Sequence, residues 1–205
     1  MSPQRRTSSE HNAALSFPDA AAWSAWLKKH HASSMGVWLR LAKKGKTKRL
    51  VTYPDALEAA LAWGWIDGQK RANDGGSWLQ RFTPRTARSG WSKINREKAK
   101  ALIDSGRMHA PGLAEVERAK ADGRWEAAYD SARTSTVPED LQKALEANRR
   151  AKSFFAKLNG ANRYAVLYRV QTAKKAETRA RRVEQLVAML ARGETIHPQR
   201  ERGVK

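Results

Sequence analysis

The sequence predicts an α+β fold, in which a small, mostly antiparallel sheet flanked by helices is followed by a helical C-terminal part. Two observations predict this class. Three short segments, at residues 36–43, 64–71 and 77–83, are bounded by glycine and turn residues, as strands are. After residue 138, apolar residues recur at helical spacing and no strand pattern is visible.

The same patterns divide the chain into four parts. Residues 1–16 are polar and are predicted to form a disordered lead. The α+β part spans 17–130, the helical part spans 138–195, and residues 196–205 are a polar tail. With 205 residues and 40% hydrophobic content, the chain is long enough to bury a substantial core.

Two helices are predicted on either side of the first strand. The first begins after Asp19, a good N-cap residue, because Trp23 and Leu27 then share one face. The second begins near Tyr53 and ends at Gly64, since glycine readily adopts the left-handed conformation that follows a helix.

The first strand is predicted to separate two kinds of side chain. Val37, Leu39 and Leu41 fall on one face, and Trp38 and Arg40 fall on the other. We therefore expect the first set to lie toward the core.

The second and third strands are predicted to form a hairpin. A loop over residues 72–76 contains the turn-forming residues and sets the register of the two strands. In that register Asp67 faces Arg81 as an ion pair, and Ile66 faces Phe82 as a core contact.

The rest of the chain is predicted to be helical. Apolar residues recur three and four positions apart, and polar or glycine residues separate the periodic segments. Helices are predicted at residues 93–104, 110–121, 138–146, 151–158, 161–172 and 175–191.

The formal net charge of +20 is unevenly distributed. Residues 1–50 carry 10 basic and 2 acidic side chains, and residues 151–205 carry 13 and 4, whereas residues 101–150 carry 8 and 9. A positive field attracts anions, so the expected partner is an anionic ligand or a polyanion such as nucleic acid. A protein partner is also compatible with this surface, and so is a purely solubilising role for the charge.

Composition and motifs exclude several classes of function. The chain has no cysteine, which excludes disulfides and thiolate metal sites. It has no Walker or dinucleotide-binding glycine pattern and no nucleophilic triad, so neither a cofactor nor a metal is expected. No apolar run is long enough to cross a membrane or to serve as a signal-peptide core, which favours a cytoplasmic location.

A basic and aromatic stretch between residues 64 and 95 is the candidate ligand-binding site. Arginine can hold an anion while the tryptophans offer planar surfaces, although the same aromatics are also suited to joining a sheet to helices. The candidate ligand-binding residues are Trp65, Asp67, Gln69, Arg81, Phe82, Arg85, Trp91, Lys93 and Asn95.

Two further basic clusters are candidate contacts to phosphate groups. One is a loop after the first strand, and the other lies on the last helix. Their members are Lys43, Lys44, Lys46, Lys48, Arg49, Lys175, Arg179 and Arg182.

Several segments together resemble the YdeI/OmpD-associated family, whose members are also described as bacteriocin-protection proteins. The resemblance spans roughly residues 17–195. It is carried by Phe17-Pro18, Gly36-Val37-Trp38, Gly64-Trp65-Ile66-Asp67-Gly68, Arg81-Phe82-Thr83-Pro84-Arg85, Trp91-Ser92-Lys93-Ile94-Asn95, Thr172-Ala173-Lys174-Lys175 and Glu177-Thr178-Arg179. It implies a role in tolerance of antimicrobial peptides or envelope stress, with an OmpD-type porin as a named partner, and it supplies no catalytic residues.

The sequence thus favours a non-enzymatic binding or stress-protection protein with a basic and aromatic anion-binding surface. Two alternatives remain at this level. One is a nucleic-acid-binding protein that uses the two basic clusters. The other is an enzyme acting on a small anionic substrate, with Asp67 as the base.

Overall fold

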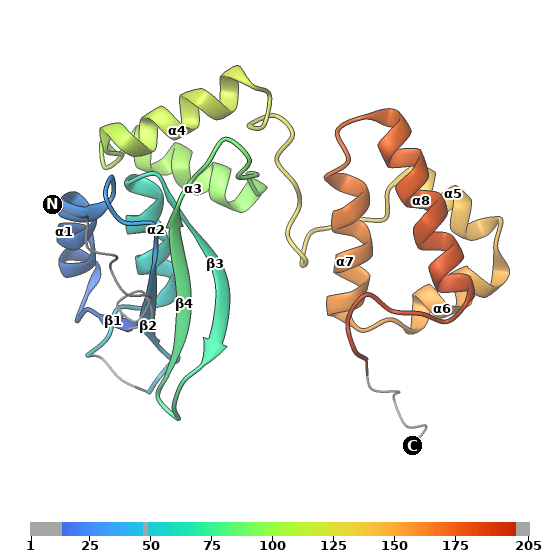
Figure 1. The fold of residues 1–205 in the computed structure, drawn as a ribbon, viewed down its shortest axis with the longest axis horizontal. Coiled ribbons are helices and arrows are strands. Elements are labelled where there is room, and N and C mark those ends of the chain that lie inside the picture. Colours follow the sequence, from blue (N-terminus) through green and yellow to red (C-terminus); the bar gives the residue numbers. More distant parts are fainter. Residues whose placement is uncertain (1–13, 47–48, 200–205) are drawn as a thin grey trace, which may run out of the picture. The chain divides into compact units, whose positions relative to one another are not determined.

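The computed structural model describes residues 14–46 and 49–199 and confirms an α+β fold with a helical C-terminal part (Figure 1). Close contacts divide the chain into two compact units. We call them the sheet unit, Met1–Trp91 with Asn95–Glu126, and the helical unit, Ser92–Ile94 with Ala127–Lys205.

The first eight elements of the described chain contain the whole sheet. Local sequence signals fix several of their ends: Asp19 accepts a hydrogen bond from the Ala22 amide at 2.8 Å, and Gly64 adopts a φ of +74° after the second helix. The elements are β1 (Ala14–Ser16), α1 (Ala20–His30), β2 (Val37–Ala42), α2 (Tyr53–Ala62), β3 (Trp65–Ala72), β4 (Ser77–Pro84), α3 (Lys93–Asp104) and α4 (Ala110–Ala121).

The sheet has the strand order β1-β2-β4-β3. The strands β2, β4 and β3 pair antiparallel, as predicted, whereas β1 pairs parallel to β2 with Ala14 beside Trp38. Residues 14–16 therefore belong to the sheet and not to a disordered lead. Three residues with little alternation carry almost no strand signal of their own, and β1 is defined by its pairing to β2. Residues 1–13 of the predicted lead lie outside the described residues.

The hairpin forms where it was predicted, but the predicted register is wrong. Asp67 faces Phe82 instead of Arg81, and Ile66 faces Thr83 instead of Phe82. At the turn, Ala72 pairs with Trp78, which is two residues away from the predicted register. The bulge in β3 between residues 67 and 70 then reverses one of these two residues, so the final register differs from the predicted one by one residue.

Asp74 explains how the hairpin turn is held. Its carboxylate accepts hydrogen bonds from the amide of Gly76 at 2.9 Å and from the amide and hydroxyl of Ser77 at 2.7 and 2.8 Å. These bonds, led by the Ser77 hydroxyl, lower the pKa of Asp74 to about 2. The turn therefore begins one residue later than the predicted loop.

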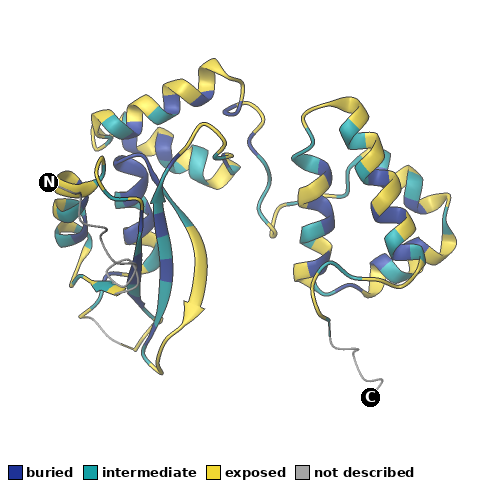
Figure 2. Ribbon diagram, viewed as in Figure 1, coloured by how far each residue is buried: buried dark blue, intermediate teal, exposed yellow. Residues whose placement is uncertain are grey.

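The core of the sheet unit is aromatic. Trp23, Trp65 and Phe82 are almost fully buried, and the Trp23 ring lies 6.2 Å from Trp65 and 5.8 Å from Phe82 between ring centroids. All eight tryptophans of the chain belong to this unit. Figure 2 shows that β4 is largely protected along its length, while β3 is exposed beyond its first residues.

The helical unit has an aliphatic core. Its predicted helices are observed within about two residues of their predicted ends, because each has a clear periodic stripe. They are α5 (Glu139–Glu146), α6 (Arg149–Lys157), α7 (Gly160–Gln171) and α8 (Ala176–Ala191). Leucine and valine from α5, α7 and α8 and Ala151 and Phe155 from α6 form one buried cluster, with Leu141, Val170 and Leu190 fully enclosed.

No helix in the described part of the chain is both long and apolar enough to cross a membrane. Among the same residues, no group of three or more histidine, aspartate or glutamate side chains is arranged to hold a metal ion.

Candidate binding site on the open face of the sheet

The two faces of the sheet have different partners. Phe82 and Trp78 lie on the face that α1 and α2 cover, where Trp78 meets the Tyr53 ring at 5.6 Å between centroids. Trp38 and Arg81 are paired with each other on the opposite face, because neighbouring residues of a strand alternate between faces. The candidate site lies on that second face.

Three residues form this site, which we call the Trp38 surface: Trp38 from β2, Arg71 from β3 and Arg81 from β4. The guanidinium carbon of Arg71 lies 4.2 Å from the centroid of the Trp38 ring, and that of Arg81 lies 6.0 Å from it. Both distances are within the range of cation–π attraction. Trp38 itself is only 5% exposed.

The electrostatics of the Trp38 surface are uncompensated within the described chain. Neither Arg71 nor Arg81 makes a side-chain hydrogen bond or an ion pair to any residue that the structure describes. Burial lowers the pKa of Arg81, and the positive charge of Arg71 lowers it further. By contrast, Arg40 on the same face is paired with Asp74.

The residues of the predicted ligand-binding set do not converge on one site. Trp65 and Phe82 are core residues, with exposed fractions of 1% and 0%. Asp67 lies on the helix-covered face, where its carboxylate accepts a hydrogen bond from the Tyr53 hydroxyl at 2.8 Å. Gln69 is exposed in the bulged part of β3, and of this part of the set only Arg81 belongs to the Trp38 surface.

The Tyr53–Asp67 pair has its own electrostatic signature. Burial raises the pKa of the Tyr53 hydroxyl, and the hydrogen bond and negative charge of Asp67 raise it further. Tyr53 therefore remains a proton donor to Asp67 across the usual pH range. The pair joins the start of α2 to β3 on the face opposite Arg81.

The C-terminal half of the predicted set lies elsewhere again. Arg85 is 5% exposed, donates to the Gly90 carbonyl at 3.1 Å and stacks on Trp91 with 3.6 Å from its guanidinium carbon to the ring centroid. Lys93 forms an ion pair with Asp130 at 2.9 Å within the helical unit. Asn95 is half-buried at the start of α3.

The predicted phosphate contacts of the loop after β2, together with Lys175, lie at the surface. Lys43, Lys44, Lys46, Arg49 and Lys175 are exposed, and Lys43 donates to the Asp74 carbonyl at 2.6 Å. Lys48 lies outside the described residues.

Arg179 and Arg182 are occupied within the helical unit. Arg179 donates to both carboxylate oxygens of Asp140, at 2.6 and 2.9 Å, and to the Val170 carbonyl at 3.1 Å. Arg182 donates to the Arg169 carbonyl at 2.7 Å. These two arginines therefore hold α8 to α5 and α7, and their role as phosphate contacts stays a prediction.

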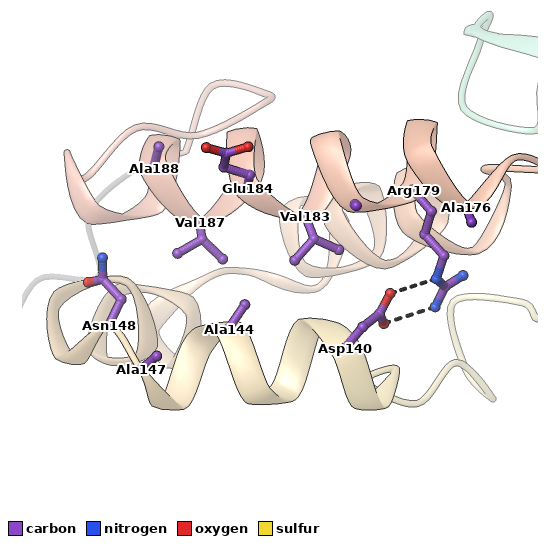
Figure 3. A pocket seen from close by; sticks show the side chains of 11 residues that line it. Asp140, Ala144, Ala147, Asn148, Ala176, Arg179, Val183, Glu184, Val187 and Ala188 are labelled. Atoms are coloured by element: carbon purple, nitrogen blue, oxygen red, sulfur yellow. Dashed lines mark hydrogen bonds and ion pairs between the residues drawn. The ribbon is translucent and has the colours of Figure 1, made fainter.

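A groove between α5 and α8 was missed by the sequence analysis (Figure 3). It has a volume of about 750 Å³, an apolar floor that includes Ala144, Val183 and Val187, and the Asp140–Arg179 ion pair across it. The signal that indicates it is the run of small residues on the facing sides of the two helices, since alanine leaves space between helix backbones.

Sequence reasoning missed two residues of the Trp38 surface. Trp38 was correctly placed on the face opposite Val37 by strand alternation, but it was not included among the candidate ligand contacts. Arg71 pairs with Leu79 near the turn, so strand alternation places it on the face of Arg81, but it too was not included among the candidate ligand contacts.

Comparison with known proteins finds two family models and no further match. Residues 15–115 match a domain of unknown function (DUF8412), and residues 134–193 match the family described as bacteriocin-protection, YdeI or OmpD-associated. No curated protein and no solved structure matches the chain.

The second match covers most of the helical unit but a shorter range than the resemblance seen in the sequence. The segments 172–175 and 177–179, which were quoted for that resemblance, lie inside it. The helical unit therefore contains a region that matches the YdeI/OmpD-associated, bacteriocin-protection family, which supports the resemblance seen in the sequence.

Proposed function

We propose that this protein is a non-enzymatic binding protein whose sheet unit holds an anionic ligand at the Trp38 surface. One observation supports this most strongly: two arginines share one indole, and neither has a carboxylate partner among residues 14–46 and 49–199. Placing two like charges together costs free energy, and an anion bound between them offsets that cost.

The other arginines of the chain support this interpretation by contrast. Buried Arg124 donates from Nε to the carboxylate of Asp122 and from Nη1 to the Ser89 carbonyl, each at 2.8 Å, so these donors are used inside the sheet unit. Arg71 and Arg81 leave their guanidinium donors available, and those donors match the oxygens of a phosphate or carboxylate. We therefore assign the ligand to the class of phosphate- or carboxylate-bearing compounds.

The family description suggests a setting for this binding. For this chain we propose that capture of an anionic ligand serves bacteriocin protection, which is the role that the description of the matched family names.

The test is calorimetric titration with inorganic pyrophosphate in about 50 mM salt, where electrostatic contacts are only partly screened. We expect Arg71→Gln and Arg81→Gln each to weaken binding by roughly tenfold or more, because a hydrogen bond to a charged group contributes about 1.5–3 kcal/mol. The matched control is Arg88→Gln, an exposed loop arginine of the same unit, which should change affinity less than about twofold. Equal loss in all three variants would contradict the assignment.

The nucleic-acid alternative is tested with the same variants. A fluorescein-labelled single-stranded oligonucleotide is titrated by anisotropy at several salt concentrations, since phosphate contacts give an affinity that falls steeply with salt. Steep binding that Lys44→Gln with Lys46→Gln abolishes, and that the Arg71 and Arg81 variants leave unchanged, would replace the small-anion proposal with a nucleic-acid function.

A further inference from the structure

A second groove of about 750 Å³ lies in the helical unit, between α6 and the C-terminal end of α8. We call it the α6–α8 groove. Its apolar part includes Phe154 from α6 and Leu190 from α8. Gly193, which ends α8 with a φ of +75°, lies beside Phe154, because a Cβ added there would be 3.8 Å from the ring. Basic side chains line the α6 side.

The charge of this groove is strongly positive. Arg149, Arg150 and Lys157 are exposed, and none of them forms an ion pair with a carboxylate that the structure describes. Arg192, at the opposite wall, is neutralised by Glu194, to which it donates two hydrogen bonds of 2.8 Å. Three cations thus remain around one apolar floor.

The position of Arg149 and Arg150 is unfavourable for the free protein. They are the first residues of α6, whose first turn contains no acidic residue. A helix N-terminus carries a partial positive charge, so basic side chains there are destabilising. The neighbouring helix α5 has the favourable arrangement, with Glu139 and Asp140 in its first turn. At the start of α6 the Asn148 side chain caps the Ala151 amide at 3.0 Å, but it is neutral and supplies no charge to balance the two arginines.

We propose that the α6–α8 groove binds an acidic, extended peptide segment of a partner protein, with one large apolar side chain of that peptide resting on Phe154. The positive rim complements carboxylates, and the apolar floor between its two ends accepts a side chain that an inorganic anion lacks. Phe154 is half-buried in this groove, so part of it is accessible to such a side chain.

The length of α6 sets the spacing of the peptide charges. From Arg149 to Lys157 the helix rises about 12 Å, at 1.5 Å per residue. An extended chain advances about 3.3 Å per residue, so carboxylates about four residues apart reach both ends of the groove. The apolar side chain lies midway between them.

The experiment uses the full chain and fluorescence anisotropy with the fluorescein-labelled peptide EEAFAEE. We expect Arg149→Glu with Arg150→Glu to weaken binding at least tenfold. The matched control, Lys174→Glu with Arg181→Glu, makes the same charge change at exposed positions of the helical unit outside the groove and should weaken binding less than about twofold. The peptide EEASAEE, which lacks the apolar side chain, should bind the unaltered protein several-fold more weakly.

Folding provides a second readout of the same variant. Replacing two unfavourable charges at the start of α6 by two favourable ones should raise the midpoint of thermal unfolding of the helical unit, measured by circular dichroism. Loss of peptide binding together with a higher midpoint supports the groove as a binding site. A lower midpoint would show that Arg149 and Arg150 stabilise the fold and would overturn the inference.

Other occupants give distinguishable results. Equal affinity for both peptides, equal loss in the control variant, or tighter groove-dependent binding of anionic phospholipid vesicles would each overturn the proposal. So would a chain ending at Gln199 that binds the peptide several-fold more tightly, because residues 200–205 would then be the occupant.

This inference is independent of the Trp38 surface. The Arg71→Gln and Arg81→Gln variants should bind the peptide normally, and the double variant of α6 should bind pyrophosphate normally. Failure of one proposal therefore leaves the other standing.

Discussion

The sheet unit and the helical unit have cores built from different kinds of side chain. The sheet unit buries indoles, and three of them use their polar N–H groups in hydrogen bonds: Trp23 donates to the Ala56 carbonyl at 3.1 Å, Trp63 to the Ser24 hydroxyl at 2.9 Å, and Trp65 to the His31 carbonyl at 3.2 Å. The helical unit buries mainly leucine and valine, which need no such partner. The aromatic core thus joins distant elements partly through directional hydrogen bonds, whereas the aliphatic core joins them through packing alone.

The two units also use arginine differently. On the open face of the sheet, Arg71 and Arg81 lie against an indole and keep their hydrogen-bond donors available. In the helical unit, Arg179 and Arg182 donate their hydrogen bonds to a carboxylate and to carbonyls at the end of α7. A basic helix face and a basic sheet face of similar composition can therefore differ in whether their arginine donors are available to a ligand.

The largest expected effect tests whether the two cores are independent. Leu141→Ala removes a fully buried side chain from the helical unit and should lower its free energy of unfolding by about 2–5 kcal/mol. Because every tryptophan is in the sheet unit, tryptophan emission follows only that unit, while far-ultraviolet circular dichroism follows both. We expect the dichroism transition to move to lower denaturant and the emission transition to stay in place. A joint shift of both would show that the units unfold as one.

A smaller effect is expected where helices approach most closely. A Cβ added to Gly112 at the start of α4 would lie 2.4 Å from the Ala62 carbonyl oxygen and 2.5 Å from the Met108 sulfur. Gly112→Ala should therefore destabilise the sheet unit by about 1–3 kcal/mol, measured by the tryptophan emission transition.

The matched substitution lies in the helical unit. Gly160 begins α7 and has open space around an added Cβ, so Gly160→Ala should stabilise that unit by roughly 0.4–1 kcal/mol. Stabilisation by both substitutions would contradict the close approach of α2 and α4.

The smallest effect is electrostatic and depends on pH. Hydrogen bonds from Arg179 hold the pKa of Asp140 below its ordinary value of 3.8. A carboxylate with a lowered folded pKa contributes stability above its unfolded pKa and loses it as the pH falls through the folded pKa. Both side chains are partly exposed, at 41% and 33%, so the contribution is at most about 1 kcal/mol.

Asp140→Asn should therefore destabilise the helical unit at pH 7 and lose that difference from the unaltered protein below pH ~4. Chemical denaturation followed by circular dichroism at both pH values measures it. Glu184→Gln, on the same groove, is the control and should change little at either pH, since Glu184 has no ion pair in the described chain. An Asp140→Asn effect that persists unchanged at low pH would show that charge is not its cause.

Much of the fold was predictable because its signals are local. Periodic apolar residues indicate the four helices of the helical unit, and Asp74 and the glycines after it indicate the hairpin. β1 was not predictable in this way, because its only support is a parallel pairing with β2, more than twenty residues away.

The candidate site was predictable only in part. Arg81 was identified, but the predicted pairing with Asp67 depended on a register that the bulge in β3 changes, and a shift of one residue moves a side chain to the other face. The tryptophans that drew attention to residues 64–95 proved to be mostly core residues, since composition alone does not distinguish an indole that binds a ligand from one that fills the interior.

The bulge in β3 has a further consequence for how this protein behaves among copies of itself. β3 is an outer strand of the sheet, and an exposed edge with a regular ladder would invite another chain to extend it. The irregularity between residues 67 and 70 breaks that ladder, and Lys70 and Arg71 follow it as exposed like charges. An approaching second edge meets broken spacing and repulsion, so the sheet resists polymerisation on this side.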